Sequence, residues 1–300
     1  MRNSIFTFLF VALAWAGCNP SSNSGGGGTA AKEISTADIL KQVRSHCSEE
    51  LGKFNQYALV LEDDATIYNQ KVLVAGSTKA RVETRVARKQ DGKETPVGDQ
   101  NIYEMWDRAA CAGLADSTIT RIAKNATLDK PEKVDGADTY VLAMPTSSVG
   151  AMGSMAFAGM PKSAKIEQVR VYVDQKQGFI RQIRSTITEK VKDKNKTATV
   201  TSIWRDFRNV KGLMIPFETV LLMEGEGIGL SDADKAQITK ELEANKQMIP
   251  QLPTKEQQEQ ARKMIARNEQ QLAKTTANRV EQGLKLVDAK VNEPLPAGLF

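Results

Sequence analysis

Histidine, the side chain most often used in general acid–base catalysis, occurs only once in this sequence of 300 residues. Its single histidine, His46, lies beside the apolar stripe of an expected helix, so a Ser-His-Asp triad would have to be built there. The adjacent carboxylates Asp63 and Asp64 fall on an expected turn, where solvated side chains are the simpler interpretation. No Gly-rich phosphate loop, nucleophile elbow or Cys/His metal spacing is present. We therefore expect no enzyme, no metal site and no cofactor.

One segment combines flexible side chains with a flexible backbone. Residues 149–161 read VGAMGSMAFAGMP and contain three Met, one Phe and three Gly between two expected strands. Met side chains adapt to contacts of varied shape, and glycine leaves the backbone mobile. Two interpretations remain open: an apolar lip that contacts a ligand, and a loop whose Met side chains fill the edge of the core. The candidate contact residues are Met152, Met155, Phe157 and Met160.

The N-terminus has the pattern of an export signal. Arg2 precedes an apolar run over residues 5–16. This run is roughly 18 Å long as a helix, which is too short for a permanent membrane span. Two small residues then precede Cys18, an order that resembles the lipobox of bacterial lipoproteins, with Trp15 where that motif usually has Leu. The sequence predicts a signal peptide over residues 1–17 and lipidation of Cys18; the alternative is an ordinary signal peptide with a chance cysteine.

The region after Cys18 has the composition of a tether. It is rich in Gly and Ser and lacks large apolar residues over residues 19–31, so it cannot form a core. A flexible chain over residues 18–35 spans roughly 25 Å on average. Asn19, directly after the cysteine, resembles the signal for sorting to the outer membrane. We therefore expect a chain anchored by lipid at the periplasmic face of the outer membrane, with one folded domain over residues 36–300.

The composition of the chain is that of an ordinary soluble globular domain. Hydrophobic residues make up 41% and charged residues 26%, and no later stretch is apolar for long enough to span a membrane. The formal charge is +5, but basic and acidic residues are mixed along the chain. A solvated mixed surface is therefore expected rather than a nucleic-acid site.

The folded part is expected to begin with a helix and to continue as strands. Ser35 and Asp38 form a capping box, apolar residues then recur at helical spacing, and Gly52 is the expected stop. The runs that follow predict an antiparallel meander, and residues 99–127 are ambiguous. The expected strands cover residues 57–60, 66–68, 71–75, 79–86, 139–144, 169–173, 179–188, 197–208, 215–223 and 279–291, with a charged loop between 188 and 197.

Residues 231–276 interrupt this β pattern. Ser231 and Thr254 each stand at the start of a helical stretch as expected N-caps, and two prolines near residue 251 separate the stretches. The apolar stripes are narrow and the other faces are strongly polar. The sequence therefore predicts a helical hairpin inserted between two strands.

The order of strands and turns resembles the LolA/LolB-like superfamily, which includes outer-membrane lipoprotein-sorting proteins and other periplasmic lipid-binding lipoproteins. The likeness covers most of residues 37–300 apart from the hairpin, and it rests on residues 71–83, 134–142, 171–181, 204–217 and 291–300. It implies an α+β fold: a curved antiparallel sheet, an unclosed half-barrel, with helices on its concave side. The inserted hairpin departs from the pattern of the superfamily.

The resemblance implies a function without catalysis. Members of this superfamily carry acyl chains or lipoproteins, so we expect a cavity that binds lipid or lipoprotein acyl chains, such as palmitate, in a carrier, acceptor or sensor. One face of the strands would line it. The candidate lining residues on the strands are Val169, Val171, Val173, Val280, Leu284 and Leu286. The alternative is an envelope partner-docking or scaffold module that uses the 231–276 hairpin and has no ligand cavity.

Two cysteines remain if Cys18 is lipidated. Cys47 and Cys111 are an even pair in an oxidising compartment, which permits one disulfide. If bonded, they would join the N-terminal helix to the sheet. Two buried free thiols are the equal alternative.

Overall fold

The computed structural model describes residues 34–62, 64–73, 80–90, 93–96, 125–145, 164–191 and 194–300. Its helices are α1 (Thr36–Lys53), α4 (Asp232–Met248) and α5 (Lys255–Lys274), with a short 3-10 helix, η3 (Ile249–Gln251), after α4. The strands are β1 (Gln56–Leu61), β2 (Ala65–Leu73), β3 (Ala80–Gln90), β4 (Lys93–Pro96), β5 (Thr127–Val134), β6 (Ala137–Pro145), β7 (Ala164–Asp174), β8 (Ile180–Val191), β9 (Lys194–Val210), β10 (Leu213–Gly225) and β11 (Arg279–Val291).

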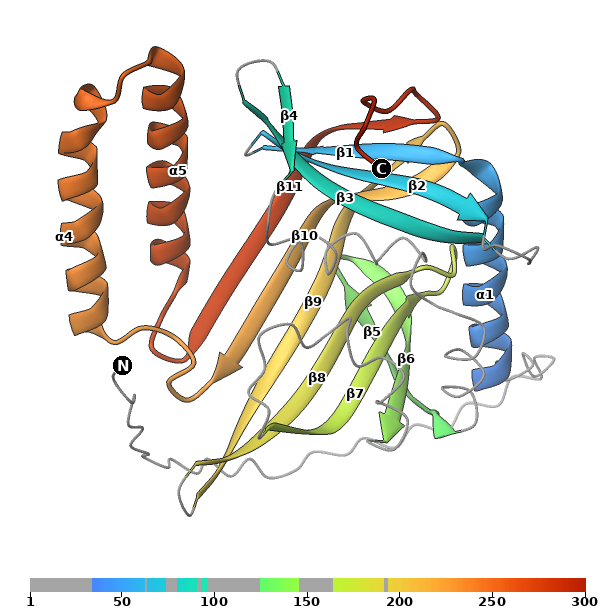
Figure 1. Cartoon of the computed structure of the whole chain (residues 1–300). Helices are drawn as coiled ribbons and strands as arrows, with labels where there is room; N and C mark the ends of the chain where they lie inside the picture. Colours follow the sequence, from blue (N-terminus) through green and yellow to red (C-terminus); the bar gives the residue numbers. More distant parts are fainter. Residues whose placement is uncertain are drawn as a thin grey trace.

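These strands form an eleven-stranded antiparallel sheet in the order β4-β3-β2-β1-β11-β10-β9-β8-β7-β6-β5. Two runs of sequential neighbours, β1 to β4 and β5 to β11, are joined where β1 pairs with β11. The sheet is strongly curved, so that β1, β2 and β3 cross the direction of β8 and β9 (Figure 1). Its edges are β4 and β5, and it does not close. The expectation of an α+β fold with a curved open sheet is thus confirmed.

Helix α1 begins at the capping box that the sequence predicts. The Asp38 amide donates to Ser35 Oγ at 3.2 Å, and the Ser35 amide donates to Asp38 Oδ2 at 3.3 Å. Beyond this cap, Ile39, Leu40 and Val43 recur at helical spacing and are buried against the sheet. The helix therefore packs on β6 to β9 through one apolar stripe.

Three features of the strands differ from what the sequence predicts. Residues 66–68 and 71–75 were expected as separate strands, but β2 is continuous to Leu73 because β1 and β3 bond its backbone on both sides. The expected charged loop between 188 and 197 is a narrow hairpin in which β8 and β9 pair as far as Val191 and Lys194. Strand β5 was not expected, since its sequence TLDKPEKV is charged and exposed at a sheet edge.

The sheet has one strongly apolar face, which is called here the α1 face. In an antiparallel pair, residues directly opposite each other point to the same face. The register therefore places Val169, Ser185, Val200, Met223 and Val280 in one row across β7 to β11 on this face. Two buried clusters cover it, one around α1 with β6 to β9 and one spanning β1, β2, β3, β9, β10 and β11.

The opposite face carries smaller clusters. Tyr172 is buried there with valine and isoleucine side chains of β5, β6, β9 and β10. At the other end of the sheet, Leu295 and Leu299 from the C-terminal segment pack against Ala58 and Tyr68. The larger share of the apolar core therefore lies on the α1 face.

Helices α4 and α5 lie in the chain between the adjacent strands β10 and β11. They stand side by side on the far side of the molecule from α1 (Figure 1). No helix among the described residues is long and apolar enough to cross a membrane.

Candidate functional site

The structure places the six strand residues predicted to line a cavity on the α1 face. Val169 and Val280 share the five-strand row described above, and Leu284 lies opposite Thr219, which itself lies opposite Trp204. The cluster around α1 contains Val169, Val171 and Val173, whereas Leu284 and the partly buried Leu286 belong to the second cluster. The predicted residues are thus brought to one face but not into one cluster.

Of the remaining predicted site residues, the structure places only Cys47. Met152, Met155, Phe157 and Met160 lie outside the described residues, as do Cys18 and Cys111. Cys47 lies in α1. Lipidation, the disulfide and the apolar lip therefore stay predictions.

Polar atoms interrupt the α1 face at a few positions. Ser185 Oγ, Trp204 Nε1 and Asn69 Nδ2 are buried and have no hydrogen-bond partner among the described residues. Asn69 does accept a hydrogen bond on its other atom, Oδ1, from Thr84 Oγ1 at 2.7 Å. Leaving a buried donor unpaired costs about 1–3 kcal/mol, so these atoms mark places where a polar group of a ligand would be favoured.

Aromatic rings and one ion pair lie beside the C-terminal half of α1. Phe179 stacks on Phe207 with ring centroids 4.0 Å apart, and the Arg181 guanidinium lies over both rings. Arg181 Nε also donates to Asp174 Oδ2 at 2.7 Å in a largely buried ion pair. His46 is half-buried with its ring 5.8 Å from that of Phe179, as part of this aromatic packing. Among the described residues, no group of His, Cys, Asp and Glu could hold a metal ion.

The helix pair α4–α5 has a small core of its own. Leu242, Ile249 and Ile265 are its buried residues, and none of them belongs to a cluster of the sheet. An ion pair between Lys263 and Asp64, at 3.0 Å, joins the outer part of α5 to the turn between β1 and β2. The pair is therefore attached to the sheet mainly by polar contacts.

Two short segments, residues 225–230 and 275–279, connect the helix pair to β10 and β11 and are called here the neck. The Gly225 amide donates to the Asn278 carbonyl at 2.9 Å, and the Gly229 amide donates to the Ala277 carbonyl at 3.1 Å. A side chain at Gly229 would overlap the carbonyl oxygen of Thr276, so only glycine permits this close approach. The two ends of the inserted segment thus lie next to each other.

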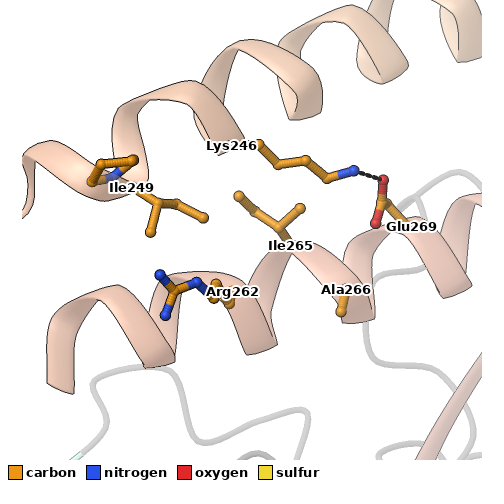
Figure 2. A pocket seen from close by; sticks show the side chains of 7 residues that line it. Lys246, Ile249, Arg262, Ile265, Ala266 and Glu269 are labelled. Carbon is orange, nitrogen blue, oxygen red and sulfur yellow. Dashed lines mark ion pairs between the residues drawn. The ribbon is translucent and has the colours of Figure 1, made fainter. Parts of the chain in front are cut away.

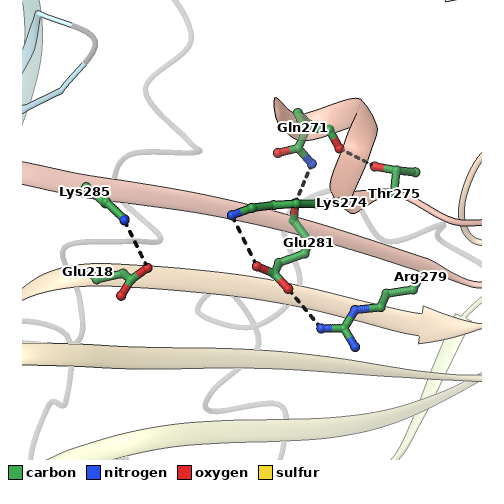
Figure 3. A network of polar contacts seen from close by, with 7 residues as sticks. All are labelled: Glu218, Gln271, Lys274, Thr275, Arg279, Glu281 and Lys285. Carbon is green, nitrogen blue, oxygen red and sulfur yellow. Dashed lines mark hydrogen bonds and ion pairs between the residues drawn. The ribbon is translucent and has the colours of Figure 1, made fainter. Parts of the chain in front are cut away.

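Glu281 is the centre of a polar network at the base of α5 (Figure 3). Its carboxylate pairs with Arg279 at 2.9 Å and with Lys274 at 3.4 Å, and its backbone carbonyl accepts from Gln271 Nε2 at 2.6 Å. Partial burial raises the pKa of Glu281, but the hydrogen bonds and charges of Arg279 and Lys274 outweigh this effect and lower it overall. The ionised carboxylate therefore holds the base of α5 against β11.

A pocket of about 370 Å³ lies between the two helices near their tip. Ile249 and Ile265 form apolar walls, while Lys246 and Arg262 stand at its rim (Figure 2). Lys246 bridges the two helices because it pairs with Glu269 at 2.6 Å and with Glu243 on its own helix. The hydrogen bond to Glu269, followed by that to Glu243, raises the pKa of Lys246. The pocket thus offers apolar walls beside a paired lysine and an exposed arginine.

Comparison with known proteins finds a weak structural likeness. No protein-family model and no curated protein matches the chain. Among solved structures, it is similar to a domain named for outer membrane lipoprotein sorting, from Vibrio parahaemolyticus, over 87% of this chain and 95% of that chain. The sequence identity is 8% and the TM-score is 0.35, so the likeness decides neither fold nor function.

Sequence reasoning missed the buried polar atoms of the α1 face. Ser185 and Trp204 lie within strands whose apolar residues alternate, and they stand in phase with those residues. A serine in phase with Ile183 and Ile187 was a signal that the sequence contained. The pocket between α4 and α5 had no such signal, because it depends on how the two helices are placed.

Proposed function

We propose that this chain is a membrane-tethered periplasmic lipoprotein that binds the acyl chains of a lipid or a lipoprotein in an apolar cavity on the α1 face. The observation that carries the proposal is the apolar face itself, which continues across adjacent strands of an open, curved sheet. The resemblance to lipid-binding lipoproteins points the same way. In this function the protein is a carrier, acceptor or sensor and catalyses no reaction.

The free energy available from such binding is ample. Removing a 16-carbon chain from water is worth on the order of 12 kcal/mol, at about 0.8 kcal/mol per methylene. A carrier must also release its cargo, so part of this energy has to be offset by opening the site. The apolar face provides the contact surface for an acyl chain. Because α1 already covers part of this face, a ligand would have to share the face with α1.

Native mass spectrometry of the protein purified without detergent tests the proposal. Leu286 and Val287 are neighbours on β11, but Leu286 lies on the α1 face, whereas Val287 is 62% exposed at a β-bulge. The wild type and Val287→Gln should carry a co-purified lipid, and Leu286→Gln should lose most of it. Thermal unfolding of each variant shows whether the fold is intact. Folded wild type that is free of lipid and also fails to bind a fluorescent fatty acid would overturn the proposal.

The proposed tether is tested separately. We expect the mature chain to start at Cys18, with residues 1–17 removed and acyl chains on the cysteine. Three acyl chains hold a protein stably in a membrane, whereas one is marginal. Mass spectrometry of the N-terminal peptide should show the lipid mass on Cys18, and an unmodified cysteine would refute the anchor without affecting the ligand proposal.

A second candidate function is a docking module that uses the helix pair. The observations that favour it are the pocket near the tip and the exposed side chains of Met248 and Met264, which are 59% and 60% accessible. A photo-crosslinking residue in place of Met248, or in place of Met264, should then give a protein adduct of defined mass in cells. Deletion of residues 231–275 should leave lipid binding unchanged if the helix pair only docks. Absence of any adduct at either Met position would exclude this function.

A further inference from the structure

A polar band crosses the α1 face of the sheet. Ser185 on β8 lies opposite Val200, and Ser202 is two residues further along β9, on the same face. Trp204 follows two residues later and lies directly opposite Thr219 on β10. Residues at these spacings have neighbouring side chains on one face of a sheet. The register therefore makes Ser185, Ser202, Trp204 and Thr219 one continuous band.

The band is buried within apolar surroundings. The exposed fraction of each residue in the band is 0% for Ser185, 4% for Trp204, 7% for Ser202 and 8% for Thr219. Apolar residues precede and follow it on the same face, including Val169, Val200 and Leu221. A band of hydroxyls and an indole in such a place is unfavourable for folding unless its hydrogen-bonding groups are paired.

Two atoms of the band have no partner among the described residues: Ser185 Oγ and Trp204 Nε1. The indole nitrogen can only donate a hydrogen bond, and the serine hydroxyl can donate one. Both therefore call for an acceptor oxygen. Since leaving such donors unpaired is costly, a ligand that brings acceptors to them gains affinity that a pure hydrocarbon would not.

We propose that this band binds the carbonyl oxygens of ester-linked or amide-linked acyl chains, and so selects acylated lipids over hydrocarbon of the same length. The inference rests on the proposed function, because it names the chemical class of the ligand on the same face. The acyl chains lie along the apolar rows, and the carbonyl groups at their heads accept hydrogen bonds from Trp204 and Ser185.

The chemistry of the band favours a neutral carbonyl over a free carboxylate. A buried carboxylate requires a cation or several donors to offset its loss of hydration. The four band residues carry no charge. Arg181, a cation on β8, is already paired with Asp174 at 2.7 Å. An ester or amide carbonyl needs only the one or two donors that the band provides.

Calorimetric titration with two matched lipids tests the proposal. The probes are dioctanoyl phosphatidylglycerol and its dioctyl diether counterpart, which has the same headgroup and chain length but no carbonyl groups. The wild type should bind the diester about tenfold more tightly, as expected for one or two net hydrogen bonds. Trp204→Phe and Ser185→Ala should each reduce this ratio, and the double variant should bring it close to one.

Two controls keep the result specific. Thr186→Ala changes the neighbour of Ser185 that points to the opposite face, so its diester preference should equal that of the wild type. The indole resonance assigned to Trp204 by its loss in Trp204→Phe should move downfield in ¹H,¹⁵N spectra with the diester and not with the diether. This readout does not require the variants to be fully stable.

The outcomes separate this inference from the proposed function. If the wild type binds both lipids equally and the indole resonance does not move, the band does not recognise carbonyl groups, although the face still binds acyl chains. If octanoate binds as tightly as the diester, the site takes carboxylates and the assignment to neutral carbonyl groups is wrong. If neither lipid nor octanoate binds, the proposed function fails and the inference fails with it.

Discussion

The α1 face of the sheet and the helix pair α4–α5 bury very different amounts of apolar surface. Two clusters of fifteen and ten buried residues lie on the α1 face, whereas three residues form the buried core of the helix pair. The attachments differ in kind as well. α1 meets the sheet through Ile39, Leu40 and Val43, while α5 meets it through ion pairs to Glu281 and Asp64.

The two regions therefore have separate sources of stability. Burial of apolar surface is the main favourable contribution to folding, and exposed ion pairs are each worth about 0–1 kcal/mol. The sheet should therefore form one cooperative unit, and the helix pair should open at lower free energy. Ligand binding fits the α1 face of the sheet, and movement relative to the sheet fits the helix pair.

The largest expected effect on stability distinguishes the core of the sheet from the core of the helix pair. Leu59 on β1 and Leu242 on α4 are 5% and 7% exposed, so each Leu→Ala substitution removes similar buried volume. Leu59→Ala should lower the free energy of unfolding of the whole domain by about 2–5 kcal/mol. Leu242→Ala should speed hydrogen exchange in α4 and α5 while the urea midpoint of the sheet stays near that of the wild type. Equal shifts of that midpoint would show that the helix pair and sheet unfold together.

A smaller effect is expected at the neck. Gly229→Ala forces a side chain against the Thr276 carbonyl. The hydrogen bond from the Gly229 amide to the Ala277 carbonyl must therefore break or shift. Faster exchange should appear at residues 225–230 and 275–279, with α1 and β6 to β9 unchanged. Gly52→Ala is the matched control, because a Cβ at Gly52 would meet nothing within 4 Å. Unchanged exchange at the neck would mean that this close approach is relaxed in solution.

The attachment of α5 should depend on pH through Glu281. Its pKa is lower in the folded protein than in the unfolded chain, so the ionised carboxylate stabilises the attachment. That contribution is complete above the ordinary pKa of a glutamate and is lost as the pH falls through the lowered value. Exchange at the base of α5, corrected for the intrinsic exchange rate of amides at each pH, should therefore be faster in acid in the wild type. Glu281→Gln should show the fast exchange already at neutral pH, and a slow neutral-pH exchange in this variant would contradict the role of Glu281.

The smallest expected effect concerns the outer ion pair of α5. Lys263 and Asp64 are each about half exposed, so their pair should contribute less than about 1 kcal/mol and weaken with added salt. Asp64 has a φ of 63°, a conformation that asparagine also tolerates. Asp64→Asn should therefore increase exchange at the outer part of α5 slightly at low salt and not at 1 M salt. A large loss of global stability would show that the pair is more than an outer contact.

Much of the fold could be predicted because the relevant signals are local. The capping box at Ser35 and Asp38 and the strand over residues 279–291 follow from neighbouring residues, and both are present in the structure. Strand β5 could not be predicted, since Pro131 and its lysines contradict a strand and only pairing with β6 makes it one. The pairing of β1 with β11 could not be predicted either, because it joins segments more than 200 residues apart.

The candidate site could be predicted only as a face. Alternation places Val169, Val171 and Val173 on one side of β7, but the sequence does not say which side is covered by α1. The polar band was beyond prediction for a related reason. Ser185 and Trp204 come to lie on the same face only through the register of β8 and β9. The candidate residues could therefore be assigned to one surface only once the pairing of the strands was known.

Photo-crosslinking with an acyl lipid tests most directly where a ligand lies. A phospholipid with a diazirine at the middle of one acyl chain should label residues of the α1 face, such as Val200 or Val280, in the full-length protein. Peptides of α4 and α5 should remain unlabelled, and Leu286→Gln should reduce the labelling while Val287→Gln does not. Labelling confined to the helix pair or to the face that carries Tyr172 would contradict a lipid site on the α1 face.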